Sequence, residues 1–371
     1  MHAAELHLPG QIAIAGGCSG ELGAVAARLG MRRPMLVTDP YMAEHGPVPA
    51  FADALGAPVF AGVQPDPTTG NVAAGLAALA EHECDGVVGV GGGSSLDTAK
   101  AVAVMARNAG TIADYAGYGR IPRAGLPLIG VPTTAGTGSE VTRVTVITDT
   151  ERQVKMMLLD DHLLCDAALV DYELTLSCPR ELTAFVGVDS LTHAIESYVS
   201  AKASPVTDDW ALRAAALIGA HLRRAWREPG DRDARAALAL GATLAGMAFS
   251  NASVALVHGM SRPIGAHFHV PHGLSNAVLL PEVTRWSLDG APERYARIAA
   301  ALGVEDLVAA LQQLNDDLEI PRLATLAERE RFDAVKADMA DAALASGSPA
   351  FNPRVPDAGE IVALYERVYA T

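Results

Sequence analysis

Short apolar runs alternate with longer helix-like segments through the first half of the chain. Four of these runs have the length and the apolar character of buried strands, and they lie at residues 11–15, 34–38, 86–90 and 127–131. Alanine-rich segments with helical spacing separate the first three runs and follow the third. Strands that alternate with helices form parallel sheets, so the first half is predicted to be an α/β unit with a parallel sheet.

The pattern changes near residue 180, where the strand signals fade. Apolar residues then recur with helical spacing in five segments, at 181–200, 207–226, 231–258, 292–302 and 357–369. We therefore predict two domains, an α/β domain over 1–180 and an all-helical domain over 181–371. No low-complexity linker separates them, and a ligand site is expected in the cleft between the two halves.

The composition agrees with two folded domains. The chain has 371 residues, of which 50% are hydrophobic and 19% are charged, which allows a sizeable core and excludes disorder as the main state. Acidic residues outnumber basic ones by 43 to 28, giving a net charge of −15, and no Lys/Arg-rich block is interleaved with aromatic residues. Nucleic acids and anionic membrane surfaces are therefore not expected as partners.

Three features bear on the cellular compartment, which we expect to be the cytoplasm. The N-terminus has neither a basic segment nor a continuous apolar segment, so no export or mitochondrial signal is predicted. Residues 236–261 are uncharged, but their Ala, Gly and Ser content favours a buried helix over a membrane span. The cysteines are far apart and are predicted to be isolated thiols without a disulfide, at Cys18, Cys84, Cys165 and Cys178.

A glycine-rich turn follows the third predicted strand. Three consecutive glycines at 91–93 precede Ser94 and Ser95, which open a helix. Glycine lets the backbone approach a ligand closely, and the helix N-terminus offers free N–H groups and a partial positive charge, which together suit a pyrophosphate. The alternative is an ordinary strand-to-helix turn in which a serine caps the helix.

Two further segments favour a dinucleotide site. Residues 15–20 form an imperfect G-x-G-x-x-G fingerprint, and Asp39 follows a strand about 20 residues later, where a carboxylate would bind ribose hydroxyls and repel the 2′-phosphate of NADP. Asp39 is otherwise a turn residue before Pro40. A glycine- and hydroxyl-rich run at 132–140 follows the fourth strand, so two such loops end neighbouring strands. This arrangement predicts one dinucleotide cleft, with NAD preferred.

The second half contains candidate metal ligands. Asp189 and His193 are four residues apart on one helix face, which suits two ligands of one cation and also suits a plain Asp–His hydrogen bond. Four of the eleven histidines then fall within one nearly uncharged segment, at His258, His267, His269 and His272. One carboxylate with three neutral imidazoles would bind Fe²⁺ or Zn²⁺, and spacing alone does not identify which histidines are ligands.

Taken together, these motifs resemble the iron-containing (group III) alcohol dehydrogenase family. GGGSSLDTAK at 91–100, PTTAGTGSE at 132–140, DSLTHAIE at 189–196, HGM at 258–260 and PHG at 271–273 occur in the family order and spacing. The resemblance implies an N-terminal dinucleotide-binding domain, a C-terminal helical metal domain and a homodimer. It also implies four metal ligands: Asp189, His193, His258 and His272.

The same resemblance implies the remaining site and the reaction. Hydride would pass between a small alcohol, or its aldehyde or ketone, and NAD(H), with Fe²⁺ or Zn²⁺ activating the substrate oxygen. Asp97 would line the nicotinamide end and Phe249 would face the substrate. The implied cofactor contacts are Asp39, Gly92, Gly93, Ser94, Asp97, Thr133, Thr134, Thr137, Thr142, Lys155 and the backbone near Leu174.

One position departs from the family pattern. Many members have a second histidine four residues after the first, whereas this chain has Arg262 after His258. An arginine stays protonated and does not relay the alcohol proton, so His267, His269 or a water chain becomes the candidate relay. Arg262 itself is a candidate anchor for a carboxylate, sulfonate or phosphonate of the substrate, and the alternative is a structural salt bridge, for instance to Glu196.

Two other functions compete with this one. An enzyme of the dehydroquinate synthase or glycerol dehydrogenase type would share the two-domain plan, but Asp189 with three histidines and the complete 132–140 loop argue against it. A non-catalytic protein that senses dinucleotide would have no need of metal ligands. Net formation of NADH distinguishes a dehydrogenase from the synthase, and metal-free protein that binds NADH normally but shows no turnover would favour the sensor.

Overall fold

The computed structural model describes residues 5–152 and 154–371. Contacts group these residues into two compact units, Leu6–Ser177 and a second unit made mainly of Cys178–Thr371. We describe each unit by itself.

A six-stranded sheet forms the centre of the first unit, and every pair of neighbouring strands in it is parallel. Its order is β1 (Gln11–Ile14), β9 (Ala167–Val170), β6 (Leu128–Pro132), β4 (Gly86–Gly91), β2 (Pro34–Val37) and β3 (Val59–Phe60). Strands β1, β2, β4 and β6 are the four predicted runs, so the parallel α/β prediction is confirmed. The two strands that were not predicted, β3 and β9, are short.

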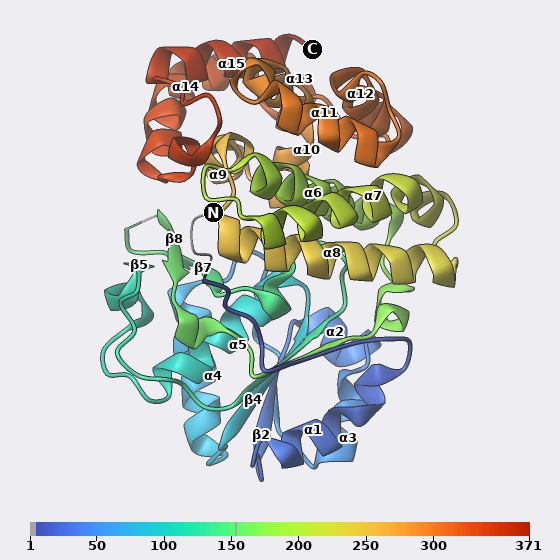
Figure 1. Cartoon of the computed structure of the whole chain (residues 1–371). Helices are drawn as coiled ribbons and strands as arrows, with labels where there is room; N and C mark the ends of the chain where they lie inside the picture. Colours follow the sequence, from blue (N-terminus) through green and yellow to red (C-terminus); the bar gives the residue numbers. More distant parts are fainter. Residues whose placement is uncertain (1–4, 153) are drawn as a thin grey trace. The chain divides into compact units, whose positions relative to one another are not determined.

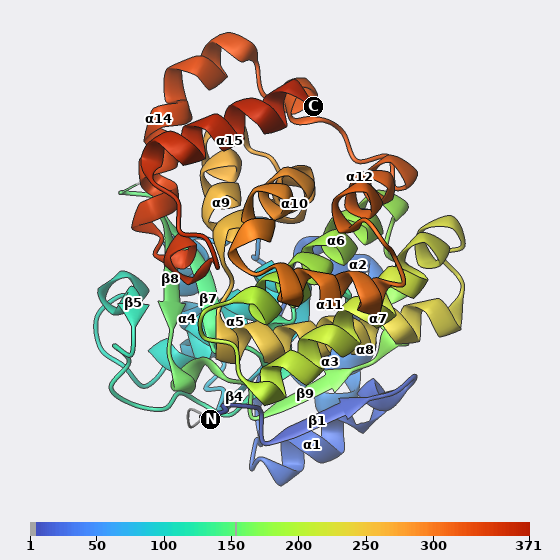
Figure 2. The ribbon, with the colours of Figure 1, turned by 45° about the horizontal axis from the view of Figure 1, so that its top comes forward.

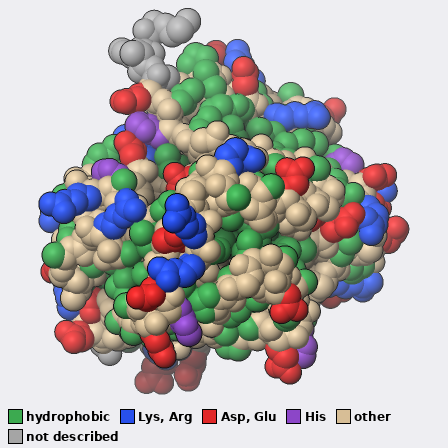
Figure 3. Space-filling view, turned by 90° about the horizontal axis from the view of Figure 1, so that it is seen from below, with side chains coloured by type: hydrophobic (Ala, Val, Ile, Leu, Met, Phe, Trp, Pro, Cys, Tyr) green, Lys and Arg blue, Asp and Glu red, His purple; other side chains and the backbone are tan. Residues whose placement is uncertain are grey.

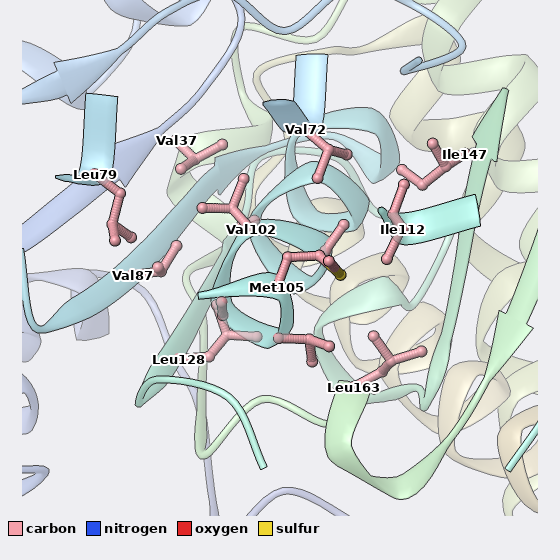
Figure 4. Packing of buried hydrophobic residues seen from close by; sticks show 14 of the residues in the cluster. Val37, Val72, Leu79, Val87, Val102, Met105, Ile112, Leu128, Ile147 and Leu163 are labelled. Atoms are coloured by element: carbon pink, nitrogen blue, oxygen red, sulfur yellow. The ribbon is translucent and has the colours of Figure 1, made fainter. Parts of the chain in front are cut away.

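Side chains of alternate residues enter two separate cores, one on each face of this sheet. Val87 contributes to the core under α4 and α5, whereas its neighbour Val88 contributes to the core under α1 and α3. Figure 4 shows the first core, where Val102 and Met105 of α5 lie among residues of the sheet. The helices of this unit are α1 (Leu22–Arg28), α2 (Pro40–His45), α3 (Val48–Leu55), α4 (Thr69–Glu81) and α5 (Gly93–Met105).

The strand order reverses next to β2. The chain passes from β2 to its outer neighbour β3 and then returns to β2's other side to form β4. Strands β2 and β4 lie side by side in Figure 1. In open α/β sheets, ligands bind outside the carboxyl ends of the strands at such a reversal. Asp39 follows β2 and the glycine turn follows β4, so both candidate cofactor segments lie at this point.

A second, smaller sheet was not predicted from the sequence. It contains β5 (Gly117–Tyr118), β8 (Val154–Leu159) and β7 (Val144–Asp149), and β7 and β8 form an antiparallel pair. Side chains of β7 alternate between buried and half-buried, as in a strand with one covered face.

The second unit is helical throughout its described residues, as predicted. Its helices are α6 (Arg180–Val199), α7 (Pro205–Arg227), α8 (Arg232–Ala252), α9 (Leu256–Phe268), α10 (His272–Ser287), α11 (Pro292–Leu302), α12 (Leu307–Asp317), α13 (Leu323–Leu326), α14 (Arg329–Ala345) and α15 (Ala358–Ala370). Helix α6 is almost entirely buried and packs against α7, α8 and α10 (Figure 2).

The single helix predicted over 231–258 is wrong. The chain breaks after Ala252, where Ser253 has a positive φ of 67°, and α8 and α9 are bent by 102°. His258 consequently lies in the first turn of α9, and not at the end of a long helix.

The described residues include no single helix that is long and apolar enough to cross a membrane, although the bent pair α8 and α9 together passes that test of length and composition. All four cysteines are free thiols. On the face drawn in Figure 3, acidic and basic side chains are interspersed.

Candidate active site

Helix α6 presents Asp189 and His193 on one buried face. Both side chains are nearly inaccessible, at 3% and 6% exposure, and His193 Nε2 lies 3.8 Å from Asp189 Oδ1. The i, i+4 spacing read from the sequence therefore does bring the two side chains together.

The first turns of two other helices bring His258 and His272 to the same carboxylate. Their Nε2 atoms lie 3.6 Å and 3.9 Å from Asp189 Oδ1. Gly273 permits this approach of α10 to α6, because a Cβ there would lie 2.5 Å from the carbonyl oxygen of Phe185. Ligand atoms of Asp189, His258 and His272 all lie within 4.8 Å of one another, as in a site that could hold a metal ion.

This donor set fits a divalent transition metal. Two ligands of a tetrahedral cation at about 2.1 Å are separated by roughly 3.4 Å, which is close to the distances from Asp189 to the three imidazoles. Burial would raise the pKa of Asp189, but the surrounding histidines outweigh it and lower that pKa. Desolvation lowers the pKa of His272 to about 3. The charges of the other histidines and of Arg262 add to this shift, and the charge of Asp189 opposes it. The carboxylate is thus charged and the His272 imidazole neutral, which are the forms that bind a cation.

Two residues that were not predicted complete the surroundings of these donors. The Glu196 carboxylate accepts a 2.7 Å hydrogen bond from His258 Nδ1. Asn276 Nδ2 donates to Asp189 Oδ1 at 2.6 Å and lies 3.2 Å from His258 Nε2, while its own buried Oδ1 has no hydrogen-bond partner. Glu196 ends the DSLTHAIE motif and Asn276 lies one turn after His272, so proximity to the ligands in sequence is the signal that could have identified both.

Phe249 packs against the predicted ligands. Its ring stacks on His193 with centroids 4.2 Å apart, and His193 in turn stacks on His258 at 4.6 Å. Phe249 is thus held against His193, as expected for a side chain near the metal.

Arg262 lies one helical turn beyond His258. Its Nη1 donates to Ser348 Oγ at 3.2 Å, in the 3₁₀ turn Ser348–Phe351. Desolvation lowers the pKa of Arg262 and the charge of Glu196 opposes that shift. Glu196 accepts its hydrogen bonds from His258 and from the backbone at the start of α9. The salt bridge between Arg262 and Glu196 that the sequence suggested is therefore not formed as a direct contact, and only an electrostatic attraction joins the two residues.

The two remaining candidate relays lie at the far end of α9. His267 is nine residues after His258 on the same helix, which corresponds to about 14 Å along its axis. His269 ends that helix with a left-handed backbone, at φ 56°, and is exposed. A direct relay from either residue would have to span that distance.

The glycine turn of the first unit has the geometry of an anion site. Gly91 adopts φ +142°, which side chains rarely allow, and a Cβ there would lie 2.5 Å from Ser95 Oγ. Gly92 is the N-cap of α5, and no side chain caps that helix. Ser94 and Ser95 are inside the first turn, so the alternative of a serine N-cap is wrong, and the N-terminal N–H groups of α5 keep no capping side chain.

The 132–140 loop adjoins this turn. Thr133 N–H donates to the Gly91 carbonyl oxygen at 3.0 Å, and Thr134 and Thr137 lie beside Gly92 and Gly93. The two loops at the ends of β4 and β6 are therefore in contact, as predicted for one dinucleotide cleft.

Asp97 and Thr142 take part in hydrogen bonds between α5 and the 132–140 loop or the residues that follow it. Asp97 is half-buried and accepts hydrogen bonds from Ser139 Oγ at 2.7 Å and from Val146 N–H at 2.8 Å. Thr142 Oγ1 accepts a 3.1 Å bond from Lys100 Nζ, and the fully buried Lys100 was not predicted as a functional residue. Burial raises the pKa of Asp97 and lowers the pKa of Lys100, and each residue partly offsets the shift of the other.

Three predicted cofactor contacts remain, Asp39, Lys155 and Leu174. Asp39 caps α2 by accepting from Met42 N–H at 3.0 Å, and Ser95 Oγ donates to its second oxygen at 3.3 Å. Lys155 forms a 2.7 Å ion pair with Asp66. Leu174 is partly buried against the core under α1 and α3.

In the imperfect fingerprint at 15–20, donor groups are already hydrogen-bonded to another part of the chain. The Asp171 carboxylate accepts from Gly17 N–H at 2.9 Å and from the hydroxyl of Ser19 at 2.6 Å. It also accepts from Ser19 N–H at 3.3 Å. The donors that a pyrophosphate would need are therefore taken by a protein carboxylate, and this segment is not an open phosphate loop.

Comparison with known proteins accounts for both units. Residues 9–172 match the model of the family described as iron-containing alcohol dehydrogenase, and residues 183–369 match the C-terminal model of the same family. The chain belongs to the iron-containing alcohol dehydrogenase family.

Relatives of this family match nearly the whole chain. Alcohol dehydrogenase 4 of Schizosaccharomyces pombe is 37% identical over 364 residues, covering 94% of this chain and 85% of its own. A solved 1,3-propanediol oxidoreductase superimposes with a TM-score of 0.95 at 35% identity and covers 99% of this chain and 100% of its own. A sulfoacetaldehyde reductase from Bifidobacterium kashiwanohense, solved with NAD⁺, has a TM-score of 0.91 at 28% identity, with both chains covered completely.

Proposed function

We propose that this protein is a divalent-metal-dependent alcohol dehydrogenase that transfers hydride between a small alcohol, or its aldehyde or ketone, and NAD(H). The observation that supports it most strongly is the convergence of His193, His258 and His272 on the Asp189 carboxylate at 3.6–3.9 Å. A cation bound there would act as a Lewis acid toward the oxygen of the alcohol or carbonyl group. Family membership assigns the reaction class to this arrangement.

The chain's own residues supply binding and orientation. The N–H groups at the start of α5 would hold the pyrophosphate, and Thr134 and Thr137 lie beside them. Asp39 lies at the end of β2, where its carboxylate would accept from the ribose hydroxyls and repel a 2′-phosphate. We therefore propose NAD over NADP, which agrees with the NAD⁺ complex of the Bifidobacterium relative.

Fe²⁺ is the proposed metal, with Zn²⁺ as the alternative. One carboxylate oxygen and three imidazole nitrogens suit either cation, and the family description favours iron. A homodimer in the cytoplasm completes the proposal, on the sequence resemblance and on the four free thiols.

Arg262 supports a finer proposal for the substrate, that it includes an anionic group. The guanidinium is one helical turn from His258, and its charge contributes to the lowered pKa of His272, so a positive charge lies near the metal donors. A fixed guanidinium suits a carboxylate, sulfonate or phosphonate. The name of the Bifidobacterium relative includes such a substrate, sulfoacetaldehyde.

One assay tests the function. Metal-free protein is loaded anaerobically with Fe²⁺ and NADH formation is followed with neutral alcohols and diols, and with alcohols that have a carboxylate, sulfonate or phosphonate. We expect turnover that stops with a chelator and is absent in Asp189→Asn. If NADH binds tightly and no alcohol is oxidised, the dehydrogenase proposal gives way to the synthase-type or sensor alternatives.

The role of Arg262 has its own comparison. In Arg262→Gln we expect the KM for anionic alcohols to rise at least tenfold, while the KM for a neutral alcohol changes little. Arg285→Gln is the matched control and should change neither, because the exposed Arg285 pairs with Glu282 on α10 and not with a proposed metal ligand. An unchanged KM for anionic alcohols in Arg262→Gln would show that this residue does not anchor the substrate.

A further inference from the structure

The Glu196 carboxylate has an unusual set of partners for a side chain in the middle of a buried helix. It is 4% exposed and accepts from the backbone N–H groups of Ala255 at 2.9 Å and Val257 at 2.5 Å. It also accepts from His258 twice, from the backbone N–H at 3.4 Å and from ring Nδ1 at 2.7 Å.

These contacts explain how α9 begins. The N-cap of α9 is Ala255, which has no side chain able to cap, and the helix follows the sharp break at Ser253. The N–H groups of a first helical turn need acceptors when they are buried. Glu196 provides them from α6, so a residue of one helix sets where the next helix starts.

The same carboxylate determines which nitrogen of His258 has the proton. An ionised carboxylate only accepts hydrogen bonds, so His258 Nδ1 must be the donor. In the neutral ring, Nε2 then has its lone pair on the side that faces Asp189, 3.6 Å from its Oδ1, with Asn276 Nδ2 3.2 Å away. A histidine held in this tautomer is ready to coordinate through Nε2.

We propose that Glu196 is a positioning residue of the metal centre, which fixes the tautomer and orientation of His258 and strengthens it as a ligand. This inference rests on the proposed role of His258 in binding the metal. Loss of a carboxylate partner of this kind typically costs ten- to a hundredfold in metal affinity. Glu196 does not contact the substrate in this role, because it acts through His258.

A purely structural role would give a different result. If Glu196 only capped α9, its replacement would lower stability and leave the affinity of the folded protein for metal unchanged. Asp231 provides the matched control, because this carboxylate caps α8 by accepting from Ala234 N–H at 3.0 Å and lies on a helix without a metal ligand.

The experiment compares whole-chain proteins in metal-free form. Co²⁺ is titrated anaerobically against a chelator of known affinity, and the visible absorption of the bound ion reports its ligand geometry. Urea unfolding without metal measures stability separately. The proteins are the unsubstituted chain, Glu196→Gln, Glu196→Asp and Asp231→Asn.

We expect Glu196→Gln to bind Co²⁺ at least tenfold more weakly, with an altered absorption spectrum, and Glu196→Asp to recover part of the loss. Asp231→Asn should lose stability only. Equal affinity and an identical spectrum in Glu196→Gln would overturn the proposal. If the unsubstituted chain binds no Co²⁺, the metal centre itself fails and this inference fails with it, whereas a loss confined to the Glu196 variants leaves the metal centre standing.

A second measurement needs no variant. Burial would lower the pKa of His258, but its hydrogen bonds to Asp189 and Glu196 raise it. At a pH above that pKa, ¹⁵N-labelled histidine in the metal-free protein distinguishes the two neutral tautomers of His258 by NMR. The proposal requires the proton on Nδ1, and a proton on Nε2 would contradict it even if Glu196→Gln failed to fold.

Discussion

The ammonium group of Lys100 donates a 2.9 Å hydrogen bond to the carbonyl oxygen of Thr142. A second bond of 2.8 Å reaches the carbonyl oxygen of Val144 at the start of β7, and the charge of Asp97 lies nearby. The dinucleotide helix α5 and the end of the 132–140 loop are therefore joined by a charge that is buried in the core.

Replacing Lys100 by Met should destabilise the protein by about 1–3 kcal/mol, because the carbonyl oxygens of Thr142 and Val144 would lose their charged donor. Urea unfolding of the metal-free protein measures the loss. Lys155→Met is the control, since its ion pair with the exposed Asp66 is worth about 1 kcal/mol or less. Equal stability of the two variants would mean that the hydrogen bonds of Lys100 do not support the loop.

Asp39→Asn should weaken the preference for NAD over NADP by about tenfold or more. The amide oxygen can still cap α2, while the negative charge that would repel a 2′-phosphate is gone. The ratio of kcat/KM with NADH to that with NADPH is the measurement. An unchanged ratio would leave Asp39 as a helix cap only.

Removal of the metal should lower the melting temperature of the native protein but not that of Asp189→Asn. A ligand present at about a hundred times its Kd stabilises the state that binds it by about 2.7 kcal/mol. Thermal unfolding with Fe²⁺ and with a chelator gives the two values. If Fe²⁺ leaves the melting temperature of the unsubstituted chain unchanged, these four donors do not form a metal site.

The four thiols should differ in their rates of alkylation. Cys165 is 2% exposed and its pKa is raised to about 12, mainly by burial, so almost no thiolate is present at pH 8. Cys18 is only half-buried and should react first. Iodoacetamide labelling followed by mass spectrometry tests the order, and urea should make all four equally reactive. Early labelling of Cys165 in native protein would contradict the buried position of this residue, two positions before β9.

The contact between α14 and α15 should make stability depend on pH. Arg329 and Lys336 each pair with both Asp333 and Glu366, and these bonds lower the pKa values of the two acids. A carboxyl whose folded pKa is lowered stabilises the fold above its unfolded pKa of about 4, and that contribution is lost as the pH falls through the folded value. In Glu366→Gln, the acid side of the stability profile should be flatter, and high salt should reduce the difference. Superimposable acid profiles for Glu366→Gln and the unsubstituted chain would show that the cluster contributes nothing.

Much of this fold follows from local pattern. The runs that became β2 and β4 are apolar at every position because both faces of the sheet are covered, and such runs are easily recognised. The candidate metal donors also stood out, because a carboxylate and several histidines lie in a nearly uncharged setting, but spacing alone did not identify which histidines are ligands. What pattern could not supply was β3, which has only two residues, and the β7–β8 pair, whose burial depends on the residues packed behind it.

The break between α8 and α9 shows why other features of the fold could not be predicted from the sequence. Residues 252–256 contain neither glycine nor proline, so nothing local ends a helix there. The acceptor that starts α9 is Glu196, about sixty positions earlier in the chain, and a window of neighbouring residues does not include it. The prediction of a phosphate-binding fingerprint at 15–20 failed for the same reason, since Asp171, which accepts the hydrogen bonds of this loop, is more than 150 residues away.

All four proposed metal ligands belong to residues 189–272 of one unit, while the glycine turn and its threonine loop belong to the other. Substitutions that abolish one ligand set therefore leave the residues of the other untouched. The two sets of residues can therefore evolve separately: a related chain can change its metal ligands while selection on its glycine and threonine loops stays the same. Differences in metal and differences in nucleotide preference should thus vary independently among related chains.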